Sequence, residues 1–154
     1  MFQPYDLNWH GIRIGEKCIE SRIITHELLH ALGLQHEHQR KDRDNYIEIQ
    51  NGNILEDFKQ WYSKEDYGRN YGIPYNVMSL MHYKDFDNSR NGQPTITLRG
   101  YQPRCSGNIG SANELGLHEE LLVRKFYECS IPKSSFLALY GAQLIHTIAM
   151  TIVC

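Results

Sequence analysis

The feature that most constrains this chain is the segment from His26 to His36, which reads HELLHALGLQH. His26 and His30 are four residues apart, so on an α-helix both imidazoles lie on one face and can bind one zinc ion. Gly33 is the residue type that most readily ends a helix with positive φ, and the turn there brings His36 to the same metal. Three protein ligands leave one position of a tetrahedral zinc site open, which is typical of catalytic sites. We therefore predict one Zn²⁺ per chain, held by His26, His30 and His36.

Two further residues support this prediction. Glu27 lies about 100° further round the helix than His26, so its carboxylate can reach a water molecule at the metal as general base. A bare HExxH pattern also arises by chance, and a helical histidine pair is often only a surface pair. The fixed offsets of Gly33 and His36, and a methionine turn at residues 79–83 (SLMHY), argue against coincidence. Met81 is expected to pack beneath the ligands as an apolar floor.

These motifs carry a resemblance to a known family. Residues 26–46, HELLHALGLQHEHQRKDRDNY, closely resemble the zinc signature of the astacin family of zinc metalloendopeptidases, a group of metzincins. Residues 79–83 are similar to the SxMHY turn of that family, and residues 127–129 to its closing Tyr-x-Cys. The resemblance implies an α+β metzincin-like fold, with a zinc helix and a C-terminal subdomain that contains the Met-turn and a final helix. It implies hydrolysis of peptide bonds in protein or peptide substrates, and secretion to the extracellular space.

The resemblance also implies roles for Tyr83 and Glu37. Tyr83 matches a tyrosine that is a fifth zinc ligand in the resting enzymes and swings to stabilise the oxyanion, a task that suits a phenol hydroxyl. A buried structural tyrosine is the alternative. Glu37 matches a glutamate that meets the new N-terminus after propeptide removal, and because this chain shows no such partner we expect Glu37 to be unpaired. Composition alone favours a solvated loop for residues 37–46, whereas the resemblance implies a structural brace. His82 is not expected to be a ligand, since the triad is already complete.

The length and the ends of the chain shape the expected domain organisation. The 154 residues allow one domain with a modest core. We divide the chain into a short N-terminal segment (1–17), an incomplete peptidase domain (18–130) and an apolar tail (131–154). The family places a sheet-bearing subdomain before the zinc helix, and 25 residues cannot hold one. We therefore expect an N-terminally truncated domain whose N-terminal sheet is largely missing. Residues 1–17 contain no apolar segment of a signal peptide.

Charge and cysteine content limit the partners. Sixteen basic and eighteen acidic side chains give a net charge of −2 without a basic stripe, which argues against nucleic acid. The four cysteines, Cys18, Cys105, Cys129 and Cys154, form no CxxC pair, so disulfides in an oxidising compartment are expected, with the pairing open. Residues 134–154 carry no Asp, Glu, Lys or Arg and are long enough to span a membrane, although their polar residues weaken that interpretation.

Two alternatives to an active protease follow. One is a catalytically inactive zinc-binding fragment or relic, with intact ligands but an incomplete substrate cleft. The other is a membrane-tethered, non-enzymatic interaction module built on the apolar tail. The presence of Glu27 and Tyr83 favours the enzyme, and the short N-terminal part favours the relic.

Periodicity predicts the elements that carry these motifs. The zinc helix is predicted over residues 18–32 and, being apolar nearly all round, is expected to be buried. Strands are predicted at 47–49 and 95–98, with a helix-prone segment at 54–62 and a final helix at 113–127. The residues expected to face the core in the last two segments are Ile54, Leu55, Phe58, Trp61 and Tyr62, and then Leu117, Leu121, Leu122, Lys125 and Phe126.

Overall fold

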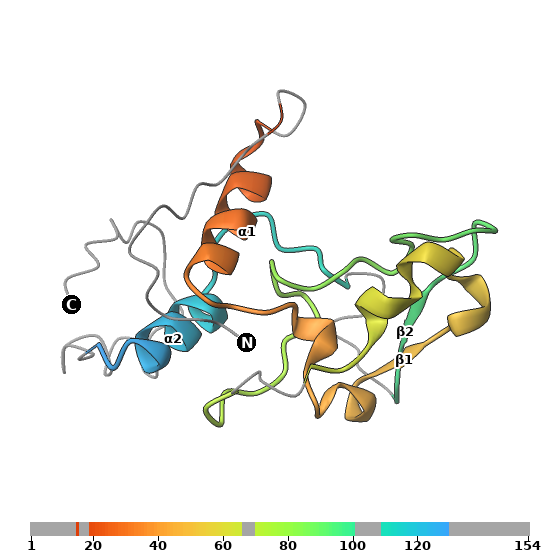
Figure 1. The fold of residues 1–154 in the computed structure, drawn as a ribbon. Helices are drawn as coiled ribbons and strands as arrows, with labels where there is room; N and C mark the ends of the chain where they lie inside the picture. Colours follow the sequence, from red (N-terminus) through yellow and green to blue (C-terminus); the bar gives the residue numbers. More distant parts are fainter. Residues whose placement is uncertain (1–14, 16–18, 66–69, 101–108, 130–154) are drawn as a thin grey trace.

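The computed structural model describes residues 15, 19–65, 70–100 and 109–129. Within these ranges the chain forms two α-helices, two strands and several short 3₁₀ helices, in agreement with the predicted α+β class. The elements are, in order, α1 (Ser21–Ala31), η2 (Glu37–Gln39), η3 (Arg43–Asn45), β1 (Ile47–Ile49), η4 (Asn51–Asn53), η5 (Glu56–Tyr62), β2 (Ile96–Leu98) and α2 (Leu117–Phe126). Figure 1 shows α1 and α2 together at one end and the two strands at the other.

The two strands form an antiparallel pair at the end of the molecule away from the helices. Ile47 stands opposite Leu98 and Ile49 opposite Ile96, so the buried Ile47 and Ile96 face the same core. Both strands were predicted, and β2 begins one residue later than expected. An isolated bridge pairs Ile54 with Ser89, so the segment after β1 also contacts the segment before β2.

Two hydrophobic clusters fill the described part of the molecule. The first lies beside the strands and contains Ile47, Ile54, Tyr62, Tyr75, Val77, Ile96 and Ile109. The second joins α1, α2 and the methionine turn, and contains Leu29, Leu34, Leu80, Met81 and Val123. The second cluster therefore fixes α1, which carries two of the predicted ligands, against the segment that contains Met81.

The prediction that the zinc helix is buried all round is wrong. Of the α1 residues only Leu29 is buried, and Leu28 is 48% exposed. The reason is that α1 uses one side to join the second cluster, while its opposite side is not covered by another described element. The helix is also shorter than predicted, since it begins at Ser21 and ends at Ala31.

The expected core face of residues 54–62 is also partly wrong. Ile54 and Tyr62 are fully buried, but Leu55, Phe58 and Trp61 are 43%, 40% and 52% exposed. The segment folds as a 3₁₀ helix, in which three residues complete a turn. Residues three apart therefore align, and this turn places the three exposed side chains along one outward side.

The final helix has a different inward face from the one predicted. It starts at Leu117, and its buried residues are Glu119 and Val123, whereas Leu117 and Phe126 are 44% and 43% exposed. A carboxylate can take an inward position only where donors meet it. Ser79 and the backbone around Leu80 supply those donors, as described below.

Several expectations concern residues outside the described ranges. Cys18, Cys105 and Cys154 lie there, so the expected disulfides stay a prediction, as does the role of the tail at 134–154. The described helices include none that is both long and apolar enough to cross a membrane.

Candidate metal centre

The end of α1 sets the path from the second histidine to the third. Gly33 has φ of +97°, as predicted, and its N–H donates to the carbonyl of His30 at 2.9 Å. The next N–H, of Leu34, donates to the carbonyl of Leu29 at 3.0 Å. This pair of bonds is a Schellman motif, which ends a helix and reverses the chain. Leu29 and Leu34 also meet in the second hydrophobic cluster, so the turn is held by apolar contact as well.

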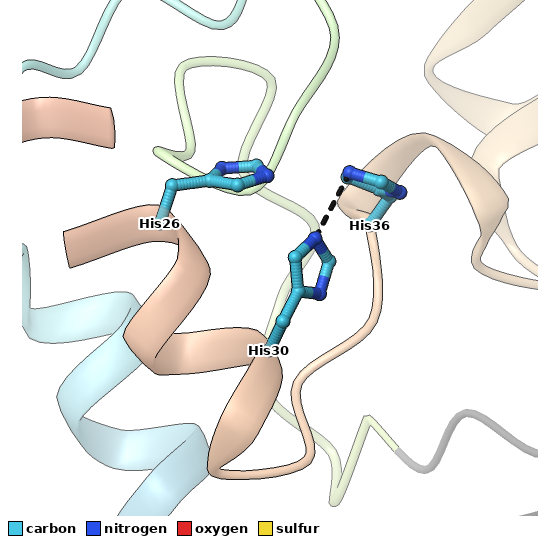
Figure 2. A group of neighbouring side chains, drawn as sticks. All are labelled: His26, His30 and His36. Atoms are coloured by element: carbon cyan, nitrogen blue, oxygen red, sulfur yellow. Dashed lines mark hydrogen bonds between the residues drawn. The ribbon is translucent and has the colours of Figure 1, made fainter. Parts of the chain in front are cut away.

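The turn brings the three predicted ligands together. His26 and His30 come from α1 and His36 from the segment after it, and their candidate ligand atoms all lie within 4.8 Å of one another. Figure 2 shows the three rings facing a common space, with the Nε2 atoms of His30 and His36 3.1 Å apart. Two nitrogens that bind one tetrahedral zinc at ~2.0–2.1 Å are ~3.3 Å apart. The spacing therefore suits a zinc ion.

Each of the three rings already has a partner for its other nitrogen. The Nδ1–H of His26 donates to the Leu80 carbonyl at 2.9 Å. That of His30 donates to the Leu34 carbonyl at 2.8 Å, and that of His36 donates to Oε1 of Gln39 at 3.2 Å. Such outer contacts fix the tautomer and the ring orientation of metal-binding histidines. They leave a lone pair on each Nε2. Because lone pairs that face one another repel, a cation between them is stabilising. The donor set therefore fits zinc.

Burial keeps two of these imidazoles in the neutral form that binds metal. Desolvation lowers the pKa of His36 to about 3, and the neighbouring charges of His30 and His26 act in the same direction. Burial is also the main cause that lowers the pKa of His26. A neutral ring offers a lone pair without first losing a proton, so metal binding does not compete with protonation of these two rings near neutral pH.

Glu27 follows the first ligand on α1, and Tyr83 lies at the edge of the triad. Glu27 is an exposed side chain of α1, next to the first ligand. Tyr83 is partly buried, with its ring centre 4.8 Å from that of His36 and 4.0 Å from that of His38, on which it stacks. Burial raises the pKa of Tyr83, so its hydroxyl keeps its proton. The structure thus brings Tyr83 to the edge of the triad.

Glu37 is not unpaired, so that expectation is wrong. Its carboxylate is 3% exposed and accepts bonds from Nη1 of Arg40 at 3.0 Å and from the backbone N–H of Asn76 at 2.8 Å. Its second oxygen lies 3.2 Å from Nε2 of His118, on α2. The Glu37 N–H donates to the carbonyl of Met81 at 2.9 Å. A single residue next to the third ligand therefore ties together three segments of the chain.

The charged run at 37–46 is a structural brace and not a solvated loop. Arg40 binds Asp42 through two bonds of 2.9 and 2.8 Å in addition to Glu37. Arg43 is buried and donates to the carbonyls of His38 and Tyr62. These guanidinium groups fix the chain that follows the third ligand, which composition alone could not indicate.

Residues of the predicted methionine turn pack against α1. Met81 is 1% exposed and packs in the second cluster with Leu29, which precedes His30, and Leu34, which follows Gly33. His82 is also buried, and its Nε2 accepts from the Tyr75 hydroxyl at 2.7 Å while its Nδ1 donates to the Tyr83 carbonyl. Both nitrogens of His82 are thus engaged away from the triad.

Sequence reasoning missed several residues that support the site. They are His38, which stacks on Tyr83, Gln39, which holds His36, and the groups Ser79, His118 and Glu119. The spacing of three residues between His36 and Gln39 is a signal that could have paired them. No local pattern separates Glu119 from the neighbouring Glu120, so its role was not readable from the sequence.

Comparisons with known proteins agree with the resemblance seen in the sequence. The family model for Astacin, which is a family of peptidases, matches residues 8–128. Zinc metalloproteinase nas-14 of Caenorhabditis elegans is 37% identical over 118 residues, which are 74% of this chain and 22% of that protein. Low choriolytic enzyme of Oryzias latipes is 39% identical over 112 residues, which are 73% of this chain and 40% of that protein.

A solved structure is similar as well. High choriolytic enzyme 1, a hatching enzyme zinc-protease from Oryzias latipes, superposes with a TM-score of 0.64 at 35% identity, covering 71% of this chain and 53% of that one. The chain thus spans between about a fifth and about half of the length of the relatives named here.

Proposed function

The chain belongs to the astacin family of peptidases, and from this membership and the triad we propose that it acts as a zinc-dependent endopeptidase. One observation carries the proposal. Three imidazoles place their ligand atoms within 4.8 Å of one another, and in each the remaining nitrogen is already hydrogen-bonded. We propose protein or peptide substrates, one Zn²⁺ per chain and an extracellular site of action.

His26, His30 and His36 would hold the metal through Nε2. When bound, zinc supplies a Lewis acid that polarises a carbonyl group and makes water a usable nucleophile at neutral pH. The contribution of the chain is to keep the three rings neutral and oriented before the metal arrives. Burial provides the first property and the Nδ1 partners provide the second.

Glu27 is proposed as the general base. It follows the first ligand on α1 and is exposed, so its carboxylate is open to a water molecule and to a substrate. A carboxylate in this position can accept the proton of the attacking water and return it to the departing amine. Peptide-bond hydrolysis then needs no covalent intermediate with the protein.

Tyr83 is proposed as a hydrogen-bond donor to the oxyanion. The raised pKa keeps its hydroxyl protonated, and a protonated phenol can donate to the negative oxygen that forms when the carbonyl is attacked. The stacked ring of His38 holds Tyr83 from one side at 4.0 Å between centres.

A zinc-binding chain without turnover is the second candidate, and the exposure of apolar groups around α1 favours it. Leu28 is 48% exposed and Ile19, just before the helix, is 70% exposed. Apolar residues on a helix normally contact another element. No described element covers this side of α1. If an element at this position is needed to complete the substrate cleft, the chain binds zinc but does not bind extended substrates.

Cleavage of a quenched, broad-specificity peptide separates these two candidates. The unsubstituted chain, loaded with one equivalent of zinc, is compared with Glu27→Gln and with Glu48→Gln as a matched control, since Glu48 is exposed and lies on β1. We expect cleavage in the unsubstituted chain and in Glu48→Gln, and a loss of at least ~100-fold in Glu27→Gln. Cleavage that persists in Glu27→Gln would contradict the proposed role, and zinc binding without any cleavage would favour the second candidate.

A further inference from the structure

A buried carboxylate on α2 meets the methionine turn. Glu119 is 1% exposed, and its Oε1 accepts from the hydroxyl of Ser79 at 2.7 Å and from the N–H of Leu80 at 3.2 Å. Its Oε2 accepts from the N–H of Gly116 at 3.1 Å. All three donors are neutral groups, so the charge of this carboxylate is not matched by an arginine or lysine among them.

From this carboxylate a chain of hydrogen bonds leads to the first predicted ligand. The hydroxyl oxygen of Ser79 accepts from the N–H of Met81 at 3.0 Å. That N–H belongs to the same peptide group as the carbonyl of Leu80, which accepts from Nδ1–H of His26 at 2.9 Å. The successive donors are therefore the imidazole, the peptide N–H and the hydroxyl, and the chain ends on the carboxylate of Glu119.

The direction of these bonds has a chemical consequence. Each group donates toward the carboxylate, and hydrogen bonds that follow one another in this way polarise each other. The bond to Ser79 makes the Leu80–Met81 peptide group a stronger acceptor for the proton on Nδ1. A stronger pull on that proton makes the other nitrogen, Nε2, a better donor to a metal. Carboxylates that contact metal-binding histidines directly act in the same sense.

We propose that Glu119 and Ser79 are positioning residues for His26. They hold the Leu80–Met81 peptide so that its carbonyl fixes the tautomer and the orientation of the His26 ring. This inference deepens the proposed function, since it concerns the same metal site. Nδ1 of His30 binds the Leu34 carbonyl, and Nδ1 of His36 binds Gln39. The series of hydrogen bonds that ends on Glu119 is therefore assigned to His26.

The burial of Glu119 supports a role beyond packing. Leu80, which donates to Glu119, and Val123, one turn further along α2, belong to the second hydrophobic cluster, where an apolar side chain would avoid the cost of desolvating a charge. Glu120, the next residue, is partly exposed and pairs with Arg124 at 2.7 Å along the same helix. It therefore offers a control for the loss of one carboxylate from α2.

The test compares Ser79→Ala and Glu119→Gln with two controls, Ser63→Ala and Glu120→Gln, in the full chain. Ser63 is an exposed serine at the end of η5. Ser79→Ala removes the link between the peptide and the carboxylate, while Glu119→Gln keeps an acceptor oxygen but removes the charge. The first readout is the ring ¹⁵N and Nδ1–H signals of His26 in the metal-free protein, recorded by NMR. The second is zinc affinity, measured by competition with a chelator.

We expect zinc affinity to fall roughly 10–100-fold in Ser79→Ala, the range known for groups behind metal ligands, with a smaller fall in Glu119→Gln. The His26 ring signals should shift in both variants and not in the controls. Unchanged ring signals and unchanged zinc affinity in Ser79→Ala, even with lowered stability, would overturn the inference. If Glu119→Gln does not fold, the result for Ser79→Ala decides.

The inference and the proposed function fail differently. If the unsubstituted chain binds zinc and the Ser79→Ala variant matches it both in zinc affinity and in the His26 ring signals, only the positioning role is lost. If the unsubstituted chain binds no zinc, the proposed function is overturned and the positioning role at a zinc site with it.

Discussion

Each candidate ligand is prepared for a metal by a group that the HExxH pattern does not contain. The partners are two backbone carbonyls, of Leu80 and Leu34, and the side chain of Gln39. A carbonyl is present whatever the side chain is, so only the amide of Gln39 can be removed by substitution. It is therefore the most accessible test of the idea that outer contacts prepare the ligands.

Replacing Gln39 by Ala should weaken zinc binding by roughly 10-fold or more, because Nδ1 of His36 loses its acceptor. Competition with a chelator measures the change. Gln60→Ala serves as the control, since Gln60 is exposed and its side-chain amide donates to the backbone carbonyl of Asp57. Equal zinc affinities for the two variants would show that the contact to Gln39 does not prepare His36.

A second prediction at this scale concerns pH. Burial lowers the pKa of His82 to about 4 in the folded chain, against 6.5 for a free histidine. Below pH 6.5 His82 is protonated in the unfolded state but stays neutral in the folded state. The free energy of unfolding therefore falls as the pH drops from 6.5 toward 4. For a shift of this size the loss is of the order of 2–3 kcal/mol.

Denaturant unfolding of the metal-free chain at pH 7.0 and pH 4.5 measures this effect together with that of the buried His36 and His38, whose pKa values are also lowered by burial. His82→Gln should reduce the difference between the two pH values, because glutamine does not take up the proton. If the variant keeps the full pH dependence of the unsubstituted chain, other groups are responsible and the assignment to His82 is wrong.

At the scale of elements, the decisive feature is the end of α1. Gly33 combines φ of +97° with a close approach of Phe126, whose ring would lie 3.3 Å from a Cβ added at this position. The backbone conformation favours glycine here, and an added Cβ would also require the Phe126 ring to shift by a few tenths of an ångström. The same turn separates the second ligand from the third, so its shape determines whether the triad can form.

Gly33→Ala should lower the free energy of unfolding by at least ~1 kcal/mol, since a residue with Cβ is unfavourable at this φ. It should also weaken zinc binding, because His36 moves with the turn. Gly52→Ala is the matched control: a Cβ there meets no atom within 4 Å. Denaturant unfolding and chelator competition give the two values. A Gly33→Ala variant as stable as Gly52→Ala would contradict the account of this turn.

The triad, the turn within it and the two short strands were predictable because their signals are local. The triad, the positive φ of Gly33, and the strands at 47–49 and 96–98 depend on residue type and spacing within a few positions. The incorrect predictions all concern contacts between elements that are distant in the sequence. The exposed side of α1 depends on which distant segments pack against the helix. Phe58 points outward because η5 has three residues per turn, which a 3.6-residue period does not describe.

At the scale of the whole molecule, the candidate metal lies where several segments meet. The second hydrophobic cluster joins α1, α2 and the methionine turn, and Glu37 ties the segment after the third ligand to Asn76 and to His118 on α2. A metal held by α1 and by His36 would add a further link between these parts. Folding and metal binding should therefore be coupled.

Zinc should raise the thermal midpoint of unfolding of the full chain, because the ion binds the folded state. At a free zinc concentration of 100 times Kd the stabilisation is about 2.7 kcal/mol. Magnesium at the same concentration should have no comparable effect, since three imidazoles suit zinc and not a cation that prefers oxygen ligands. Equal shifts with both ions would point to nonspecific binding.

Zinc stoichiometry tests whether His26, His30 and His36 form one zinc site. The full chain and its His36→Ala variant are dialysed against low zinc, and metal and protein are quantified in each. We expect close to one zinc per unsubstituted chain and a substoichiometric amount in His36→Ala, because one of the three ligands is lost. No zinc in the unsubstituted chain, or the same stoichiometry in both proteins, would contradict this expectation.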